Sequence, residues 1–169
     1  MPDYIFDTTV LSNLAIVGRL DLLEKRYRKM AHTTVEVSDE QRRGLQAGYG
    51  YLENALRQIQ SISPDGWLHI VAPESEAEYQ LRGEFDLLLD PGEASCLVLA
   101  ISRGLILVTD DLAARQLAQE RDVPLTGTVG ILLALVRDDS LSLTEANAIL
   151  AEMIGRRYRS PVDRLDELI

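Results

Sequence analysis

Several residue types are scarce in this chain, and each scarcity excludes a class of protein. Cys96 is the only cysteine among the 169 residues, so an intrachain disulfide is impossible and a zinc site built from cysteines is not expected. It lies in an apolar periodic segment and is predicted to be a small buried side chain. No apolar run approaches the roughly 20 residues that a membrane-spanning helix needs, and the first residues lack the pattern of a secretion signal. We therefore expect a cytoplasmic protein without a membrane anchor.

Basic residues are outnumbered by acidic ones. Lys and Arg together number 17 against 27 Asp and Glu, for a formal net charge of −10. This balance argues against a protein that coats nucleic acid non-specifically, because neutralising phosphates needs clustered Lys and Arg. It leaves room for an enzyme that acts on nucleic acid through metal ions. Such an enzyme needs an acidic cluster of its own, and the bound cations reverse the local charge.

Short β-prone segments alternate with helical patterns along the chain. Strands are predicted at residues 4–6, 30–34, 67–71, 105–108 and 123–126, and the main helices at 35–46, 49–61, 112–121, 128–138 and 143–155. The strand 105–108 is apolar throughout, which is typical of a parallel strand buried on both faces. The alternation predicts a three-layer α/β/α domain with a mostly parallel sheet. We assign it to residues 1–155, followed by a C-terminal tail at 156–169. Both histidines, His32 and His69, lie in predicted strands, and we assign them no general-base role.

Carboxylates follow two of the predicted strands, at the edge where a parallel sheet places ligands. Asp7 comes directly after the first strand, and Asp110 and Asp111 follow the strand 105–108. Glu93 lies in the first turn of the helix that precedes this strand. Carboxylates that converge in this way repel one another and need a cation. A site with oxygen ligands alone suits Mg²⁺ or Mn²⁺ better than zinc.

A further carboxylate is expected from the helix at 35–46, where two candidates compete. Glu36 and Glu40 are four residues apart, so both can point to the same side of the helix. Their neighbours are charged as well, and the pair also fits a solvated helix face. The sequence leaves open which of the two faces the site.

The other carboxylates also fit purely structural roles. Asp7 can cap a helix that begins at the next residue, and Asp111 can do the same for the helix at 112–121. Asp90 and Glu93 have the spacing of a capping box. Singly, none of these residues is specific, and the prediction of a site depends on their joint placement at strand ends.

Four short motifs surround these carboxylates: Ile5–Leu11, Glu40–Gly44, Gly92–Ser95 and Thr109–Arg115. With these motifs the chain resembles the PIN-domain family, small metal-dependent ribonucleases that include VapC-type toxins. The resemblance covers roughly residues 3–140. Together with Thr126–Gly130, the last motif is similar to a PIN subgroup often found in prokaryotic toxin–antitoxin loci. The chain departs from the family at Glu93, where aspartate is commoner, and at Gln41, where an apolar residue is usual.

The resemblance implies a ribonuclease that uses Mg²⁺ or Mn²⁺ to activate water for attack on a phosphodiester. It implies a shell of catalytic carboxylates, namely Asp7, Glu40, Glu93, Asp110 and Asp111. All of these except Glu40 are expected to bind the metal, with Glu36 as the alternative to Glu40. Orienting hydroxyl groups are expected from Thr8, Thr9 and Thr109. Toxin-type relatives usually form homodimers and are held inactive by a small antitoxin, so both kinds of partner are implied as well.

Positive charge is local in this acidic chain. It is concentrated in the runs Lys25–Lys29, Arg42–Arg43 and Arg156–Arg159, whose Arg and Tyr side chains can contact phosphate and stack on bases. Contact with RNA is expected chiefly from Arg42 and Arg43, although charge runs at helix ends are also common as solvated surface.

The competing function is a non-catalytic interaction module, a PIN-like fold that binds a protein partner. The amphipathic pattern of the helix at 143–155 and of the tail fits docking on such a partner. It fits packing on its own domain equally well. Retention of all the candidate carboxylates favours the enzyme.

Overall fold

A parallel sheet forms the centre of the molecule. The computed structural model describes residues 3–169, and this part of the chain contains one sheet of five strands. The strands are β1 (Tyr4–Phe6), β2 (Ala31–Thr33), β3 (His69–Ile70), β4 (Ile106–Val108) and β5 (Leu125–Thr126). Their order is β3-β2-β1-β4-β5, and every pairing is parallel. The predicted fold class is therefore confirmed, and β5 lies at the edge of the sheet directly after Pro124, a residue that is found next to edge strands because it cannot donate a hydrogen bond.

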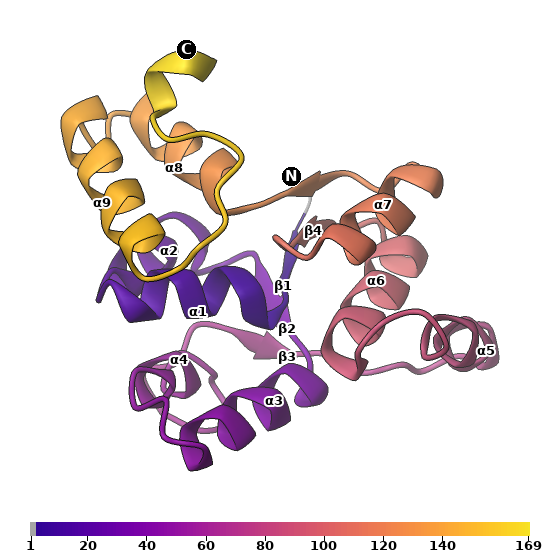
Figure 1. The fold of residues 1–169 in the computed structure, drawn as a ribbon. Coiled ribbons are helices and arrows are strands. Elements are labelled where there is room, and N and C mark those ends of the chain that lie inside the picture. Colours follow the sequence, from indigo (N-terminus) through magenta and orange to yellow (C-terminus); the bar gives the residue numbers. More distant parts are fainter. Residues whose placement is uncertain (1–2) are drawn as a thin grey trace.

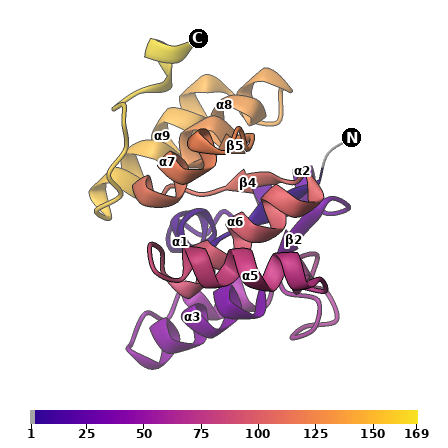
Figure 2. The same cartoon turned by 90° about the vertical axis from the view of Figure 1, so that its right-hand side faces the viewer.

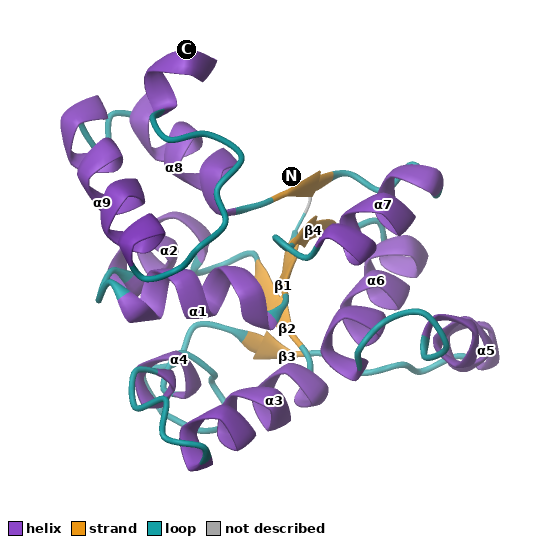
Figure 3. Cartoon of the chain, in the orientation of Figure 1, coloured by secondary structure: helices purple, strands orange, loops and turns teal. Residues whose placement is uncertain are grey.

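Helices cover both faces of this sheet, which gives the three expected layers. They are α1 (Thr8–Ile16), α2 (Leu20–Tyr27), α3 (Val35–Gln46), α4 (Leu52–Leu56), α5 (Glu76–Phe85), α6 (Pro91–Arg103), α7 (Leu112–Glu120), α8 (Thr128–Arg137) and α9 (Leu143–Gly155). Figure 1 shows α1 and α2 on one side of the strands and α6 and α7 on the other. Figure 2 shows α5 in front of α6, and Figure 3 shows the short strands enclosed by helices. Within residues 3–169, no helix combines the length and the hydropathy needed to cross a membrane.

The central strand β1 lies in the middle of the core. Ile5 and Phe6 are fully buried, and the ring of Phe6 meets that of Trp67 edge to face, with centroids 6.0 Å apart. The thiol of Cys96 is buried against the carbonyl oxygen of Phe6, with its Sγ at 3.6 Å, which confirms its predicted place in the core. Because β1 and β4 are neighbours, the residues that follow them lie side by side. The N–H of Asp7, the first residue after β1, donates to the carbonyl of Val108, the last residue of β4, at 3.1 Å.

The segment between α3 and β3 differs from the sequence prediction. A helix was expected over 49–61, but α4 ends at Leu56, and Ile59 instead forms an isolated parallel bridge with Leu68. The indole N–H of Trp67 donates to Oε1 of Gln58 at 2.6 Å, and the backbone N–H groups of Trp67 and Leu68 both donate to the carbonyl of Gln58. The residues after Leu56 therefore contact the buried indole of Trp67 and do not continue α4. The strand predicted at 67–71 is shorter in the structure and covers only β3.

The chain reverses direction after α9 through a left-handed turn. Arg157 has φ +76°, its N–H donates to the carbonyl of Ile154, and the N–H of Tyr158 donates to that of Met153. These two bonds form a Schellman motif, in which the left-handed position usually holds glycine. The following segment runs back over α8 and α9 and ends in a short 3-10 helix, η1 (Leu165–Leu168). There the side chain of Leu165 is fully buried, so the tail packs on its own domain, which was one of the two alternatives left open.

Candidate active site

Asp7 is the buried centre of the candidate site. Its side chain is almost fully buried, and Oδ1 accepts hydrogen bonds from the backbone N–H and the hydroxyl of Thr9, at 2.9 and 2.6 Å. The hydroxyl of Thr109 donates to Oδ2. Burial raises the pKa of Asp7 to about 7, although the hydrogen bonds from Thr109 and Thr9 act in the opposite direction. Asp7 therefore caps α1, as the structural interpretation expected, and it is also held in one orientation at the end of β1.

Glu93 and Asp111 face a surface hollow of about 400 Å³, which we call the acidic hollow. Residues 86–90 and Ala113 complete its lining. Asp111 caps α7, since its Oδ2 accepts from the N–H of Ala114 at 2.8 Å, and Oε2 of Glu93 accepts from the N–H of Asp90 at 3.1 Å. Within residues 3–169, the remaining oxygen of each carboxylate accepts no hydrogen bond. These two oxygens are therefore free for a ligand.

The carboxylates at the acidic hollow influence one another electrostatically. Burial raises the pKa of Glu93 to about 8, and the negative charges of Asp111 and Asp7 raise it further. Such an arrangement holds a proton or a cation more readily than it holds three negative charges. Glu93, which comes from the first turn of α6, thus shares an electrostatic environment with residues that follow β1 and β4.

Asp110 has surroundings quite different from those of Asp111. Its Oδ1 accepts from the backbone N–H of Thr128 at 2.9 Å, and its Oδ2 accepts from Nδ2 of Asn13 at 2.9 Å and from the hydroxyl of Thr128. Its own N–H donates to the hydroxyl of Thr9 at 2.8 Å. Both oxygens are thus occupied, and the side chain joins the end of β4 to α1 and to the first turn of α8.

Glu40, rather than Glu36, is on the side of the site. Its Oε2 accepts from the hydroxyl of Thr8 at 2.6 Å and its Oε1 from the N–H of Gly92 at 2.9 Å. A Cβ at position 92 would lie 2.5 Å from Oε1 of Glu40, so this close approach requires glycine. Glu36 instead accepts from Nη1 of Arg82 at 2.8 Å. The choice that the sequence left open is therefore made by contacts with α5 and α6.

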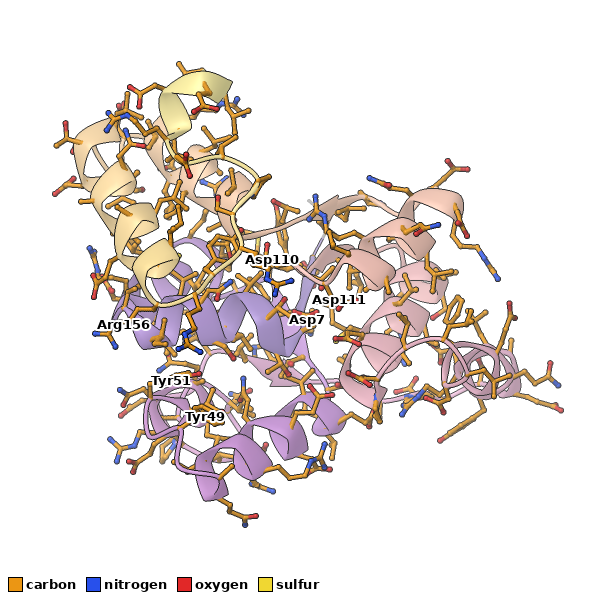
Figure 4. All side chains as sticks on the ribbon, viewed as in Figure 1. Asp7, Tyr49, Tyr51, Asp110, Asp111 and Arg156 are labelled. Atoms are coloured by element: carbon orange, nitrogen blue, oxygen red, sulfur yellow. The ribbon has the colours of Figure 1, made fainter. Side chains whose placement is uncertain are left out.

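Two of the expected substrate contacts lie apart from this cluster. Arg42 and Arg43 are exposed on α3, and Nη1 of Arg42 is 3.9 Å from Oδ1 of Asp39. By contrast, the structure brings together the expected carboxylates and threonines at the carboxyl ends of β1 and β4. Figure 4 shows Asp7, Asp110 and Asp111 close to one another in the opening between α1 and the helices α6 and α7.

Sequence reasoning missed two residues that hold the cluster in place, Asn13 and Thr128. Asn13 lies one helical turn after Thr9, which places both on the same face of α1, and it donates to Asp110. Thr128 begins α8 inside the segment Thr126–Gly130, where the sequence interpretation had only a family likeness. Both residues could have been recognised in the sequence as polar side chains in the helix turns that follow a strand and face the edge of the sheet.

The donor set fits a hard divalent cation in its chemistry, although the carboxylates do not enclose one. Within residues 3–169, no three His, Cys, Asp or Glu side chains form a ready ligand sphere. The ligands on offer are carboxylate oxygens alone, and the neighbouring charges that raise the pKa of Glu93 favour a cation. Mg²⁺ usually keeps several waters and binds proteins through one or two carboxylates. An ion held partly through water therefore fits these residues, with Asp7, Glu93 and Asp111 as its carboxylates.

Comparisons with known proteins agree with this geometry. A family model described as a PIN domain, that of the DUF3368 family, matches residues 3–169. The chain belongs to the PIN domain family, whose members are typically metal-dependent nucleases. Its fold is similar to the crystal structure of PAE2754 from Pyrobaculum aerophilum, with a TM-score of 0.54 and 18% sequence identity over 80% of this chain and 98% of that one. No curated protein matches the chain.

Proposed function

We propose that this PIN domain is an endoribonuclease that hydrolyses phosphodiester bonds at the acidic hollow with the help of Mg²⁺ or Mn²⁺. The observation that carries the proposal is the electrostatic convergence of three carboxylates, of which Asp7 follows β1, Glu93 lies in the helix before β4 and Asp111 follows β4. The negative charges of Asp111 and Asp7 both raise the pKa of Glu93. A fold kept only for packing would not gain from such repulsion, whereas a cation site depends on it.

The roles of the residues follow from their contacts. When bound, the cation would lower the pKa of a water molecule and stabilise negative charge on the phosphate oxygens. Glu93 and Asp111 would hold the cation through their free oxygens at the acidic hollow. Asp7, both of whose oxygens already accept hydrogen bonds, would contribute its negative charge from behind them, directly or through a water molecule. Thr9 and Thr109 orient Asp7 through hydrogen bonds to both of its oxygens.

Two further carboxylates would act as positioning residues. Glu40 joins Thr8 to Gly92, and thereby keeps the residues next to Asp7 and Glu93 at a constant separation. Asp110 holds the first turn of α8 against the end of β4. The direct metal contact expected for Asp110 stays a prediction, since both of its oxygens already accept hydrogen bonds.

The test is cleavage of single-stranded RNA with Mn²⁺, with Mg²⁺ and with EDTA, by the wild-type chain and by Asp7→Asn. We expect cleavage that requires the metal and falls at least about 100-fold in the variant. Glu36→Gln is the matched control, because Glu36 lies on the same helix as Glu40 but pairs with Arg82. It should retain cleavage, whereas Glu40→Gln should lower it. Melting curves establish that each variant is folded.

Two outcomes would contradict the proposal. Equal cleavage by the wild type and by a folded Asp7→Asn variant would remove Asp7 from the site. Calorimetry that finds no saturable binding of Mn²⁺, together with no cleavage, would favour the non-catalytic interaction module.

The cellular role in this proposal is that of the toxin-type member of a toxin–antitoxin pair. Its support is the likeness of the segments Asp110–Arg115 and Thr126–Gly130 to that subgroup. In that role the chain would act on RNA in the cytoplasm as a homodimer and would be inhibited by a small protein partner. Sizing chromatography and co-expression with the product of a neighbouring short reading frame test these points.

A further inference from the structure

A second cavity lies on the other side of the first turn of α7 from the acidic hollow. Its volume is about 490 Å³, within the range of small-molecule sites. The first turns of α7 and α8, the strand β5 and residues 158–161 line it. We call it the arginine-lined cavity, since Arg115 and Arg159 are on its walls. Asp110 and Leu112 line this cavity, whereas Asp111, the residue between them, lines the acidic hollow.

The turn after α9 is what brings aromatic and basic side chains to this place. The left-handed backbone of Arg157 reverses the chain, so that Tyr158 and Arg159 run back over α8 and line the cavity. Tyr158 is half-buried and lines the cavity together with Asp110. Its ring is therefore held in place at the end of the candidate active site.

The charges on the walls are available to an anion. Arg115 donates from Nη1 to the carbonyl of Thr109 at 2.9 Å, which fixes its guanidinium at the cavity. The ion pairs of residues 3–169 involve other arginines, such as Arg82 and Arg103, and include neither Arg115 nor Arg159. In a chain of net charge −10, two arginines without a carboxylate partner on one cavity point to a ligand that supplies its own negative charge.

The remaining walls are apolar. Leu112 begins α7 with 83% of its surface exposed, an unusual position for leucine, and it stands between the cavity and the acidic hollow. Leu125, Val129, Leu133 and Pro161 complete the apolar part of the lining. Apolar side chains beside an aromatic ring accept a planar heterocycle, and base stacking on aromatic side chains is the usual basis of binding to single strands.

We infer that the arginine-lined cavity is a subsite for one nucleotide of a single-stranded RNA, next to the phosphodiester that is cleaved. The base packs against Tyr158 and the apolar wall, and its phosphate faces Arg115 and Arg159. The chain of the substrate then passes Leu112 into the acidic hollow. This inference rests on the proposed nuclease function for its substrate class, and it explains how an acidic protein retains RNA at this edge of the sheet.

The test measures binding of a single nucleotide without metal, so that it does not depend on catalysis. Adenosine and uridine 5′-monophosphate are titrated into the full chain in EDTA, followed by nuclear magnetic resonance, with inorganic phosphate as the comparison. We expect saturable binding that is tighter than that of phosphate. Arg159→Glu should weaken it roughly tenfold or more, since a charge-assisted hydrogen bond is lost.

Matched variants distinguish binding in this cavity from a general effect of the protein's charge on an anionic ligand. Arg137→Glu makes the same change of charge at the last residue of α8, outside the cavity and about 6 Å along the helix beyond Leu133 of its lining, and should weaken binding much less than Arg159→Glu does. Tyr158→Ala should weaken binding roughly tenfold, whereas Tyr158→Phe keeps the ring and should bind nearly as the wild type does. In cleavage assays, Arg159→Glu should raise KM with little change in kcat.

The outcomes for the cavity and for the nuclease are distinguishable. Absence of saturable nucleotide binding, phosphate binding as tight as nucleotide binding, or equal weakening by Arg137→Glu would overturn the subsite. If the wild type binds nucleotides but cleaves no RNA with any metal, the proposed reaction fails while the subsite stands. If cleavage proceeds with the same KM in Arg159→Glu, the subsite fails while the nuclease stands.

Discussion

Asp110 and Asp111 are neighbours in sequence and yet belong to two different regions of the molecule. Asp110 faces the arginine-lined cavity, and both of its oxygens accept hydrogen bonds, from Asn13 and from Thr128. Asp111 faces the acidic hollow, where one oxygen caps α7 and the other is free. Adjacent side chains at the end of a strand point to opposite sides, so two identical residues meet different partners.

The contrast between Asp110 and Asp111 distinguishes a carboxylate that stabilises the fold from one that can bind a ligand. A carboxylate whose oxygens are all occupied contributes to stability, and its replacement leaves donors unpaired. A carboxylate with a free oxygen near other negative charges contributes little to stability and is available to a cation. The comparison assigns Asp110 to the framework of the site and Asp111 to its chemistry.

The largest expected effect on activity comes from replacing Asp110 and Asp111 by asparagine, one at a time. Asp111→Asn should lower RNA cleavage at least about 100-fold, because the free oxygen at the acidic hollow loses its charge. Its melting temperature should change little, since asparagine also caps helices. Asp110→Asn should destabilise the fold by about 2 kcal/mol, because the amide nitrogen that replaces Oδ2 cannot accept from Nδ2 of Asn13 and the charge-assisted bond from the hydroxyl of Thr128 is lost. Thermal unfolding and cleavage are measured for both variants. The same loss of activity and stability in each would remove the distinction.

The pH dependence of stability tests the carboxylates near the acidic hollow, Asp7 and Glu93. Folding raises the pKa of Asp7 from 3.8 to about 7 and that of Glu93 from 4.5 to about 8. The folded state therefore binds more protons, so their contribution to the free energy of unfolding is fully present below about pH 4 and is lost as pH rises through 7 to 8. In EDTA, Asp7→Asn should exceed the wild type in stability by more at pH 8 than at pH 5, by up to a few kcal/mol.

Urea unfolding at the two pH values measures this difference. Addition of Mn²⁺ at pH 8 should stabilise the wild type more than Asp7→Asn, because the cation replaces the missing protons. A difference between the two proteins that stays the same from pH 5 to pH 8 would show that burial of Asp7 does not strain the folded state.

The smallest expected effect is at the turn that builds the arginine-lined cavity. Arg157 adopts φ +76°, a conformation that costs an L-residue with a side chain about 1 kcal/mol relative to glycine. Arg157→Gly should therefore stabilise the fold by about 0.5 kcal/mol once the greater freedom of the unfolded chain is included. Arg156→Gly is the control, since it removes the same charge at φ −95° and should destabilise. Urea unfolding compares the two, and an equal effect would mean that the turn is not strained.

Local patterns were enough to predict much of this molecule. The apolar segment before Asp110 and the alternation of strands with helices led to the parallel sheet, and the neighbouring β1 and β4 brought Asp7 to Thr109 as expected. The helix predicted over 49–61 was too long: α4 covers only Leu52–Leu56, and the residues after it contact Trp67, whose indole donates to Gln58. A pattern along the chain has no information about an indole that is buried nine residues later.

Side-chain partners were beyond the reach of such patterns. Glu36 and Glu40 share a helix and a residue type, and the choice between them depends on Arg82 of α5 and Gly92 of α6. The run Arg156–Arg159 was recognised as basic, but the place of Tyr158 and Arg159 beside Asp110 depends on the reversal of the chain at Arg157.

The order of the elements, the parallel sheet and the edge where the carboxylates gather can be read from the chain, since hydrophobic periodicity and the ends of strands are local properties. Which carboxylates are free and which are occupied, and the cavity with two arginines next to the acidic hollow, depend on how the chain folds, because a carboxylate's role depends on the donors and charges within a few ångströms, and here these come from distant parts of the chain.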